Sequence, residues 1–328
     1  MTIPASHLLS PTDDLDNLTL TAPSYSFIIE HPSGRKILFD LALRKDWSNL
    51  PPATGGFLRT LGWKVDAPKN VSDILQDHGT SLADIDAVIW SHHHFDHVGD
   101  MTTFPPTTKL VVGPGFKEHY MPAFPTDPAS TLCEAAWRDR EVQELSFDSA
   151  AALQIGGFNA IDYFGDGSFY LLDAPGHTFG HMAGLARVAR ENNSGDSDFV
   201  FMGGDTCHFV GQFRPTVHRP LPAGPGRPAE IHASVCPGAI IDRLLANPTT
   251  PLFEMPEANA VDIHQAHEST RKMEVFDAAE NVWVVIAHDQ SLLGTVDFYP
   301  ARINDWRRRG YADKTRWMFW NTMGQKSP

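Results

Sequence analysis

Four side chains of types that commonly bind metal ions lie within six positions of the chain. They are His92, His94, Asp96 and His97. Imidazole nitrogen and carboxylate oxygen are ligands that zinc accepts. The preceding run, 87–90, is short and apolar, which is typical of a buried strand. Because strand side chains alternate and the next turn folds back, the first two histidines should face one side and the other two residues should close over the same point. A bound cation would compensate for their lost hydration.

Three further candidate ligands each follow a predicted strand. They are His177, Asp205 and His288. The first follows the run 169–172, the second follows 199–202, and the third follows the apolar run 282–286. This rhythm of strands and helices, with a polar residue at the strand ends of both halves, indicates one α/β domain in which two sheets pack together.

The ligand order resembles that of the metallo-β-lactamase superfamily, whose mark is His-x-His-x-Asp-His followed by a later His, Asp and His. The resemblance spans residues 25–293. It implies an αββα sandwich of two mixed β-sheets with outer helices and a two-metal site along one edge. The implied ligands of the first metal are His92, His94 and His177. Those of the second are Asp96, His97 and His288, and Asp205 would bridge the two.

Such a site has a clear chemical use. Two close cations need an anionic bridge, and a water shared between them loses a proton near neutral pH and becomes a nucleophile. Asp96 is a candidate catalytic residue, since a carboxylate beside that water can carry its proton away. Two zinc ions are the expected cofactors, because His94 stands where a glutamate would suggest the di-iron branch. Iron and manganese are also compatible with these ligand types.

Within the superfamily, the chain looks most like the quorum-quenching acyl-homoserine lactonases. Those enzymes have a tyrosine three residues after the bridging aspartate, and this chain has His208 there. An imidazole could donate a hydrogen bond to the developing oxyanion, or it could be an ordinary supporting residue. Both interpretations stay open. Cys207 should face away from the metals.

The expected function is hydrolysis of a lactone or related ester. An acyl-thioesterase of the glyoxalase-II or polyketide-releasing kind and a β-lactam hydrolase are alternatives, and a non-catalytic metal-binding protein is less favoured because all seven ligand positions are filled. The expected partner is a small-molecule lactone, ester or thioester, and the protein should be a monomer or homodimer. Aromatic side chains are candidate pocket walls. They are Trp47, Phe57, Trp63, Phe209 and Phe213.

Composition narrows the partners. A formal net charge of −14 argues against nucleic acids and anionic membranes. No apolar run approaches the roughly 18–20 residues that span a bilayer. No secretory signal is evident, and the three cysteines lack a framework spacing, so a reducing, cytoplasmic location is expected.

The expected organisation is an N-terminal extension (1–24), one domain (25–300) and a C-terminal extension (301–328). Loop insertions are expected near 41–70 and 211–256. Among the other polar residues, Asp40 should be a strand-end cap or turn residue rather than a ligand. His93 should pack on the opposite face, and His181 should support the site.

Overall fold

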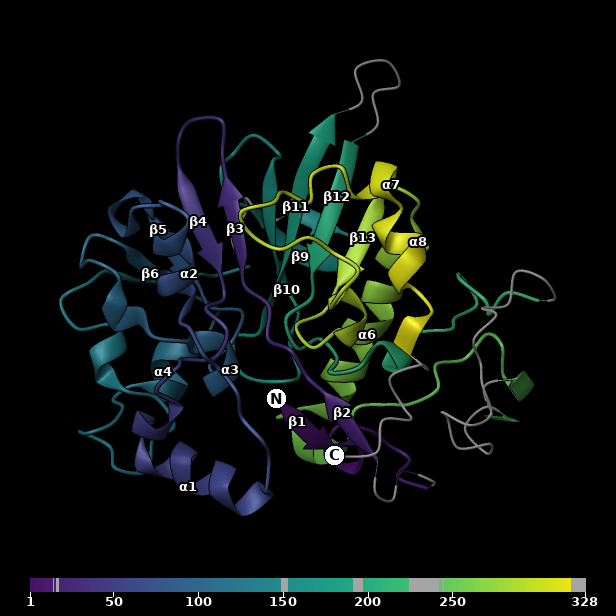
Figure 1. Cartoon of the computed structure of the whole chain (residues 1–328), viewed down its shortest axis with the longest axis horizontal. Coiled ribbons are helices and arrows are strands. Elements are labelled where there is room, and N and C mark those ends of the chain that lie inside the picture. The colour runs from purple at the N-terminus through teal and green to yellow at the C-terminus, as the bar shows by residue number, and fades with distance from the viewer. Residues whose placement is uncertain are drawn as a thin grey trace.

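Two mixed sheets pack face to face, and helices cover both outer faces (Figure 1). This is the expected αββα sandwich. The structure is a computed structural model, and it describes residues 1–13, 15, 18–148, 153–190, 197–223, 242–243 and 245–319.

The first sheet has five strands in the order β3-β4-β5-β6-β7. They are β3 (Phe27–Glu30), β4 (Lys36–Phe39), β5 (Ala87–Ile89), β6 (Lys109–Val112) and β7 (Val142–Glu144). The first two form the predicted antiparallel hairpin, and the others add in parallel. The helices α2 (Val71–Asp77), α3 (Phe95–Val98) and α4 (Phe116–Tyr120) lie on this side of the molecule (Figure 1). Asn70 and Asp73 form a capping box that starts α2.

The second sheet has six strands in the order β13-β12-β11-β10-β9-β8. They are β8 (Leu153–Ile155), β9 (Phe158–Asp162), β10 (Phe169–Asp173), β11 (Met182–Arg190), β12 (Ser197–Met202) and β13 (Val282–Val285). Only the last two pair in parallel, with Met202 opposite Val285. Their carboxyl ends therefore meet at one edge. Helix α6 (Ile263–Ala278) covers the outer face of this sheet.

Side-chain alternation divides the core into layers. Along β5, Ala87 and Ile89 lie in the cluster between the sheets, whereas Val88 and Trp90 pack under the helices of the first sheet. Buried apolar area stabilises such packing by about 25 cal/mol per Å². The two sheets therefore form a rigid base for the turns at their shared edge.

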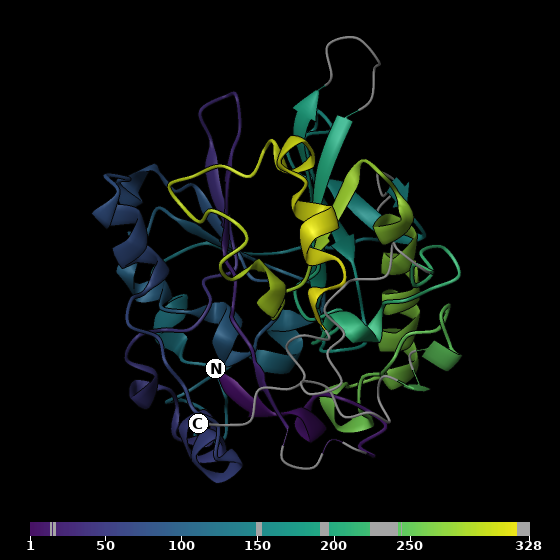
Figure 2. The same cartoon turned by 45° about the vertical axis from the view of Figure 1, so that its right-hand side comes forward.

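The expected N-terminal extension packs against the outer core of the second sheet. Strands β1 (Thr2–Pro4) and β2 (Thr19–Thr21) pair antiparallel across the lower end of the sandwich in both views (Figures 1 and 2). Ile3, Leu8, Leu9 and Leu20 are buried there. At the other end of the chain, the short helices α7 (Trp306–Arg309) and α8 (Tyr311–Thr315) pack on the core between the sheets.

One expected loop is partly helical. Within the insertion 41–70, α1 spans Pro52–Leu61, begins with proline at its first position and ends at Gly62 in the left-handed conformation. Gly55 and Gly56 lower the helix propensity of this stretch, so its helix was not predicted. Of the short helix expected at 240–246, residues 242–243 and 245–246 are described and helical, and the other three residues lie outside the described part of the chain.

Candidate metal centre

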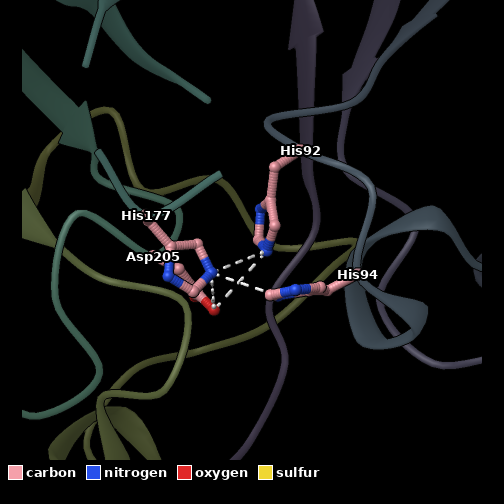
Figure 3. A group of neighbouring side chains, drawn as sticks. All are labelled: His92, His94, His177 and Asp205. Carbon is pink, nitrogen blue, oxygen red and sulfur yellow. Dashed lines mark hydrogen bonds and ion pairs between the residues drawn. The ribbon is translucent and has the colours of Figure 1, made fainter. Parts of the chain in front are cut away.

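Seven side chains converge where the strand ends of the two sheets meet, in two groups. One group is His92, His94, His177 and Asp205, and the other is Asp96, His97 and His288. Within each group, one ligand atom from every residue lies within 4.8 Å of the others. The residues of the first group come from three separate segments of the chain, and their side chains point to a common centre (Figure 3). All seven residues that the sequence singled out are thus brought together.

Asp205 belongs to the first group and also faces the histidines of the second. Its Oδ2 is 3.6 Å from Nε2 of His92 and 3.6 Å from Nε2 of His177. Its Oδ1 is 3.2 Å from Nε2 of His97 and 3.2 Å from Nε2 of His288. Each carboxylate oxygen therefore faces one group of imidazoles.

The turn before Asp205 requires glycine. Gly204 has a φ of +51°, and a Cβ on it would lie 2.9 Å from His181 Nε2 and 3.1 Å from the side chain of Ser91. A larger residue would force these groups apart. The close approach lets the second sheet deliver Asp205 beside the histidines of the first sheet.

Two ligands of the first sheet are oriented by side chains. Asp40 accepts hydrogen bonds from the Ser91 backbone (2.6 Å), the Ser91 hydroxyl (2.8 Å) and His97 Nδ1 (2.8 Å). The Ser91 hydroxyl lies 3.0 Å from Nδ1 of His92. Protons held at both Nδ1 atoms leave the Nε2 atoms free for a cation.

Two ligands of the second half are oriented by backbone carbonyls instead. His177 Nδ1 donates to the carbonyl of Asn259 (2.7 Å), and His288 Nδ1 donates to the carbonyl of Pro23 (2.6 Å). A carbonyl only accepts, so in both rings Nδ1 carries the proton and Nε2 faces the centre.

His181 supports the site from the side, in the position the sequence suggested. Its Nδ1 donates to the carbonyl of Ala174 (2.8 Å), and its Nε2 accepts the backbone N–H of Asp205 (3.0 Å). Burial lowers the pKa of His181 to about 4. The ring is therefore neutral and holds Asp205 by its main chain.

The charge state of the site suits cation binding. Burial and neighbouring imidazoles lower the pKa of His92 and His177 well below the usual range, and burial lowers that of His94 to about 4. Burial opposes ionisation of Asp205, but the surrounding imidazoles hold its pKa well below the ordinary value. The neutral imidazoles of the first group are therefore in the ligand state that a divalent metal needs. Burial opposes protonation of His97 and His288, but the nearby carboxylates raise the pKa of both, so these two rings would release a proton when a cation binds.

Among the seven candidate ligands, two buried atoms lack a hydrogen-bond partner in the described structure. They are His97 Nε2 and Asp205 Oδ1, which lie 3.2 Å apart without the geometry of a hydrogen bond. Unpaired buried polar atoms are costly, and a cation between them would satisfy both. The donor set and these two atoms therefore fit a bound metal.

The candidate catalytic residues lie in the same place. Asp96 Oδ2 is 3.6 Å from His288 Nε2, and His208 Nε2 is 3.3 Å from Asp205 Oδ2. His208 is buried, and its Nδ1 has no hydrogen-bond partner among the described residues. Beside it is a cavity of only about 10 Å³, bounded in part by His288 and Phe209. That volume holds about one water molecule.

The other predictions about nearby residues have mixed outcomes. Cys207 faces away as expected: it is buried, burial raises its pKa well above the ordinary value, and it lines a separate cavity of about 460 Å³. His93 stacks on Tyr120, as expected of a packing residue. Of the five candidate pocket walls, only Phe209 borders either cavity, and Phe213 is instead buried in the core.

Sequence reasoning missed three supporting groups. Asp40 does sit at a strand end, at a φ of +61°, and is in neither ligand group, but its carboxylate also holds His97 and Ser91. The carbonyls of Pro23 and Asn259 were not suspected, because every residue carries a carbonyl. For Asp40 one signal was available in the sequence. It is a carboxylate directly after β4, and β4 pairs with β5, the strand that precedes the ligand motif.

No helix in the described part of the chain is long and apolar enough to cross a membrane.

Comparison with known proteins agrees with this geometry. The sequence model of the metallo-beta-lactamase superfamily matches residues 21–131. Cytochrome P450 monooxygenase mpaDE' of Penicillium brevicompactum is 44% identical over 94% of this chain, but the chain spans only 35% of that relative's length. Gamma-lactamase FDB1 of Fusarium pseudograminearum is 42% identical over 97% of this chain and 78% of its own length. Metallo-hydrolase mfmC of Annulohypoxylon moriforme is 40% identical over 94% of this chain and 81% of its own length.

A solved structure shares the fold. It is the B. thuringiensis AiiA variant with bound N-decanoyl-L-homoserine. The superposition includes 92% of this chain and 94% of the AiiA chain, with a TM-score of 0.58 and 16% sequence identity. Because the 42% identity to FDB1 extends over most of both sequences, the chain belongs to the metallo-beta-lactamase superfamily.

Proposed function

We propose that this protein is a hydrolase that uses two divalent cations, with zinc as the first candidate, to open the ring of a small cyclic ester or amide. The observation that carries the proposal is Asp205, whose two oxygens each face a separate group of imidazole nitrogens. A single cation would need only one of these groups.

The first cation would be held by His92, His94 and His177, the second by Asp96, His97 and His288, with Asp205 shared. When bound, the cations would acidify a water molecule and polarise the substrate carbonyl. Histidine-rich coordination favours zinc, and iron or manganese would suit the same donors.

The chain's own residues would supply the remaining steps. We assign Asp96 to accept the proton of the attacking water and to pass it to the leaving heteroatom, because its carboxylate lies in the second ligand group. We assign His208 to donate a hydrogen bond to the carbonyl oxygen as negative charge develops there. Its unpartnered ring nitrogen and its place beside Asp205 support that role.

The relatives suggest which rings to test. Two of them are named gamma-lactamases: FDB1, and MBL2 of Gibberella moniliformis, which is 45% identical over 66% of this chain. A γ-lactam and a γ-butyrolactone are five-membered rings that differ at the leaving atom, so one site could open both. We expect the protein to act in the cytoplasm as a monomer or homodimer.

The test is a metal analysis followed by a substrate panel. Purified protein loaded with zinc should hold close to two equivalents and should open a γ-lactone or a γ-lactam. The panel should also include an acyl-thioester and a β-lactam. Turnover of the thioester alone would overturn the ring-opening proposal, and metal-loaded protein that turns over none of the four would overturn hydrolysis of these acyl classes.

A further inference from the structure

A chain of three hydrogen bonds runs from His177 to parts of the protein outside the ligand motif. His177 Nδ1 donates to the carbonyl of Asn259 (2.7 Å). The side-chain amide of Asn259 donates to the carbonyl of His7 (2.8 Å), and the indole of Trp63 donates to Nδ1 of His7 (2.9 Å). Residue 7 precedes the stretch that matches the superfamily model, and residue 259 follows it.

We propose that Asn259 is a positioning residue for the first cation, anchored by His7 and Trp63. This inference rests on the proposed two-metal function. An imidazole ligand binds a cation well only when its other nitrogen is held, because that bond fixes both the tautomer and the direction of the ring. Asn259 supplies the acceptor with its main chain and fixes that acceptor in place with its side chain.

Other hydrogen bonds hold the surrounding loop, so the side chain of Asn259 is needed only to fix the position of its own carbonyl. The backbone N–H of Val261 donates to the carbonyl of His177 (3.1 Å), and that of Asp262 donates to the carbonyl of Gly176 (3.0 Å). These two bonds tie the loop to the turn after β10 whatever residue stands at 259. Loss of the amide should therefore free the acceptor carbonyl without unfolding the loop.

The second cation provides an internal reference. Of its histidine ligands, His288 is held by the carbonyl of Pro23 and His97 by Asp40, and neither bond involves Asn259. A positioning role therefore predicts a loss confined to one of two binding steps, whereas a general loosening of the structure would weaken both.

The experiment is a stepwise Co²⁺ titration of the full chain against a chelator, followed by absorption. Asn259→Ala should weaken one step by about 10- to 100-fold and leave the other unchanged. His94→Ala and Asp96→Ala serve as references that identify which step belongs to which group. Asn259→Asp keeps the size but lacks the N–H donor, so it should behave like the alanine variant. Trp63→Phe should give a smaller loss in the same step.

Asn281→Ala is the matched control. Its side-chain amide makes a similar, half-buried bond to the carbonyl of Ser197 (2.9 Å) at the amino ends of β12 and β13, whereas Asp205 and His288 follow the carboxyl ends of these strands. Both alanine variants should lower the melting temperature of the metal-free protein by a similar amount, and only Asn259→Ala should alter metal binding.

The outcomes separate the two proposals. If the wild type binds two cations and Asn259→Ala titrates like the control, or loses both steps equally, the positioning role is overturned while the proposed function stands. If Asn259→Asp binds as tightly as the wild type, side-chain volume and not the hydrogen bond matters, and the role is again overturned. A wild type that binds no cation overturns both.

Discussion

The two halves of the metal centre are held in different ways. On the side of the first sheet, His92 and His97 depend on the side chains of Ser91 and Asp40, which lie at the ends of neighbouring strands. On the side of the second sheet, His177 and His288 depend on the carbonyls of two loop residues, Asn259 and Pro23.

This difference determines how each half responds to mutation. A supporting side chain is removed by one substitution, and its loss leaves buried donors without a partner. A supporting carbonyl is present whatever residue is chosen, so it responds only when the loop that carries it moves. The first-sheet half should therefore be sensitive at single positions, and the second half should be sensitive through its loop anchors.

Asp205 should give the largest effect, because it joins the two halves. Asp205→Asn removes the charge that, in the proposed function, offsets two cations. A loss of about 4 kcal/mol of transition-state stabilisation corresponds to roughly a thousandfold loss of kcat/KM. We expect metal content to fall below two equivalents and activity to fall by at least that factor. Elemental analysis and the kinetics of whichever substrate the panel identifies would measure both.

The contrary result would be informative. If Asp205→Asn retains two equivalents and near-normal kcat/KM, the carboxylate does not connect the halves, and each half would have to be treated as an independent site. Asp166→Asn, at a surface turn and paired with His31, is a control for the same change of charge.

His208 should give the next largest effect. It lies beside Asp205 but has no carbonyl support, since its Nδ1 lacks a partner and its backbone N–H donates to the side chain of Gln212 (2.7 Å). His208→Phe should lower kcat about a hundredfold, as expected for loss of one oxyanion donor, with metal content unchanged. Steady-state kinetics with metal analysis would check this. Unchanged kcat would assign His208 an ordinary supporting role.

Asp40 tests the sensitivity of the first-sheet half directly. Asp40→Ala removes the acceptor of three buried donors, so the affinity for one cation should fall about 10- to 100-fold, and the free energy of unfolding of the metal-free protein should fall by about 1–3 kcal/mol. The same chelator titration and urea denaturation would measure these changes.

Asp40→Asn separates two causes, because Asp40 has a φ of +61° and asparagine tolerates that conformation well. The asparagine variant should keep the backbone and still lose metal affinity. If it binds both cations as tightly as the wild type, backbone conformation and not the carboxylate supports His97.

The same comparison explains what the sequence could predict. The ligand motif, the paired sheets and the long helix α6 follow from local patterns: apolar runs of strand length, a helical period and polar residues at strand ends. The seven candidate ligands were found because histidine and aspartate are uncommon directly after apolar, strand-like runs. The geometry around Asp205 is consistent with that prediction.

Supporting groups were harder to predict for a physical reason. Asp40 acts on His97 across 57 positions of sequence, and pairing between strands sets that contact. A carbonyl such as that of Asn259 has no side-chain signature at all. The helix α1 was missed because its glycines oppose helix formation, and tertiary packing of Thr54 and Leu58 compensates for them.

A smaller effect comes from Glu274 on α6, which lines the larger cavity away from the candidate ligands. Its titration changes the stability of the folded protein with pH, and this change has to be subtracted before a pH dependence is assigned to the metal centre. Burial raises its pKa from the ordinary 4.5 to about 7. The folded state therefore binds this proton more tightly than the unfolded state does, so stability is highest below pH 4.5 and falls as the pH rises toward 7. A shift of this size corresponds to about 3 kcal/mol for a fully buried group, and the partial exposure of Glu274 reduces the expected change to about 1 kcal/mol.

Glu274→Gln should remove this slope, because glutamine stays neutral throughout the range. Melting temperatures of the metal-free protein between pH 4.5 and 7.5 would show a flatter profile for the variant, while Glu257→Gln, at an exposed position in the turn Glu257–Asn259, should follow the wild type. If the slope of the wild type persists in Glu274→Gln, the titrating groups lie elsewhere. The histidines of the two halves would then be the first place to look, since burial and the nearby carboxylates change their proton affinity in opposite directions.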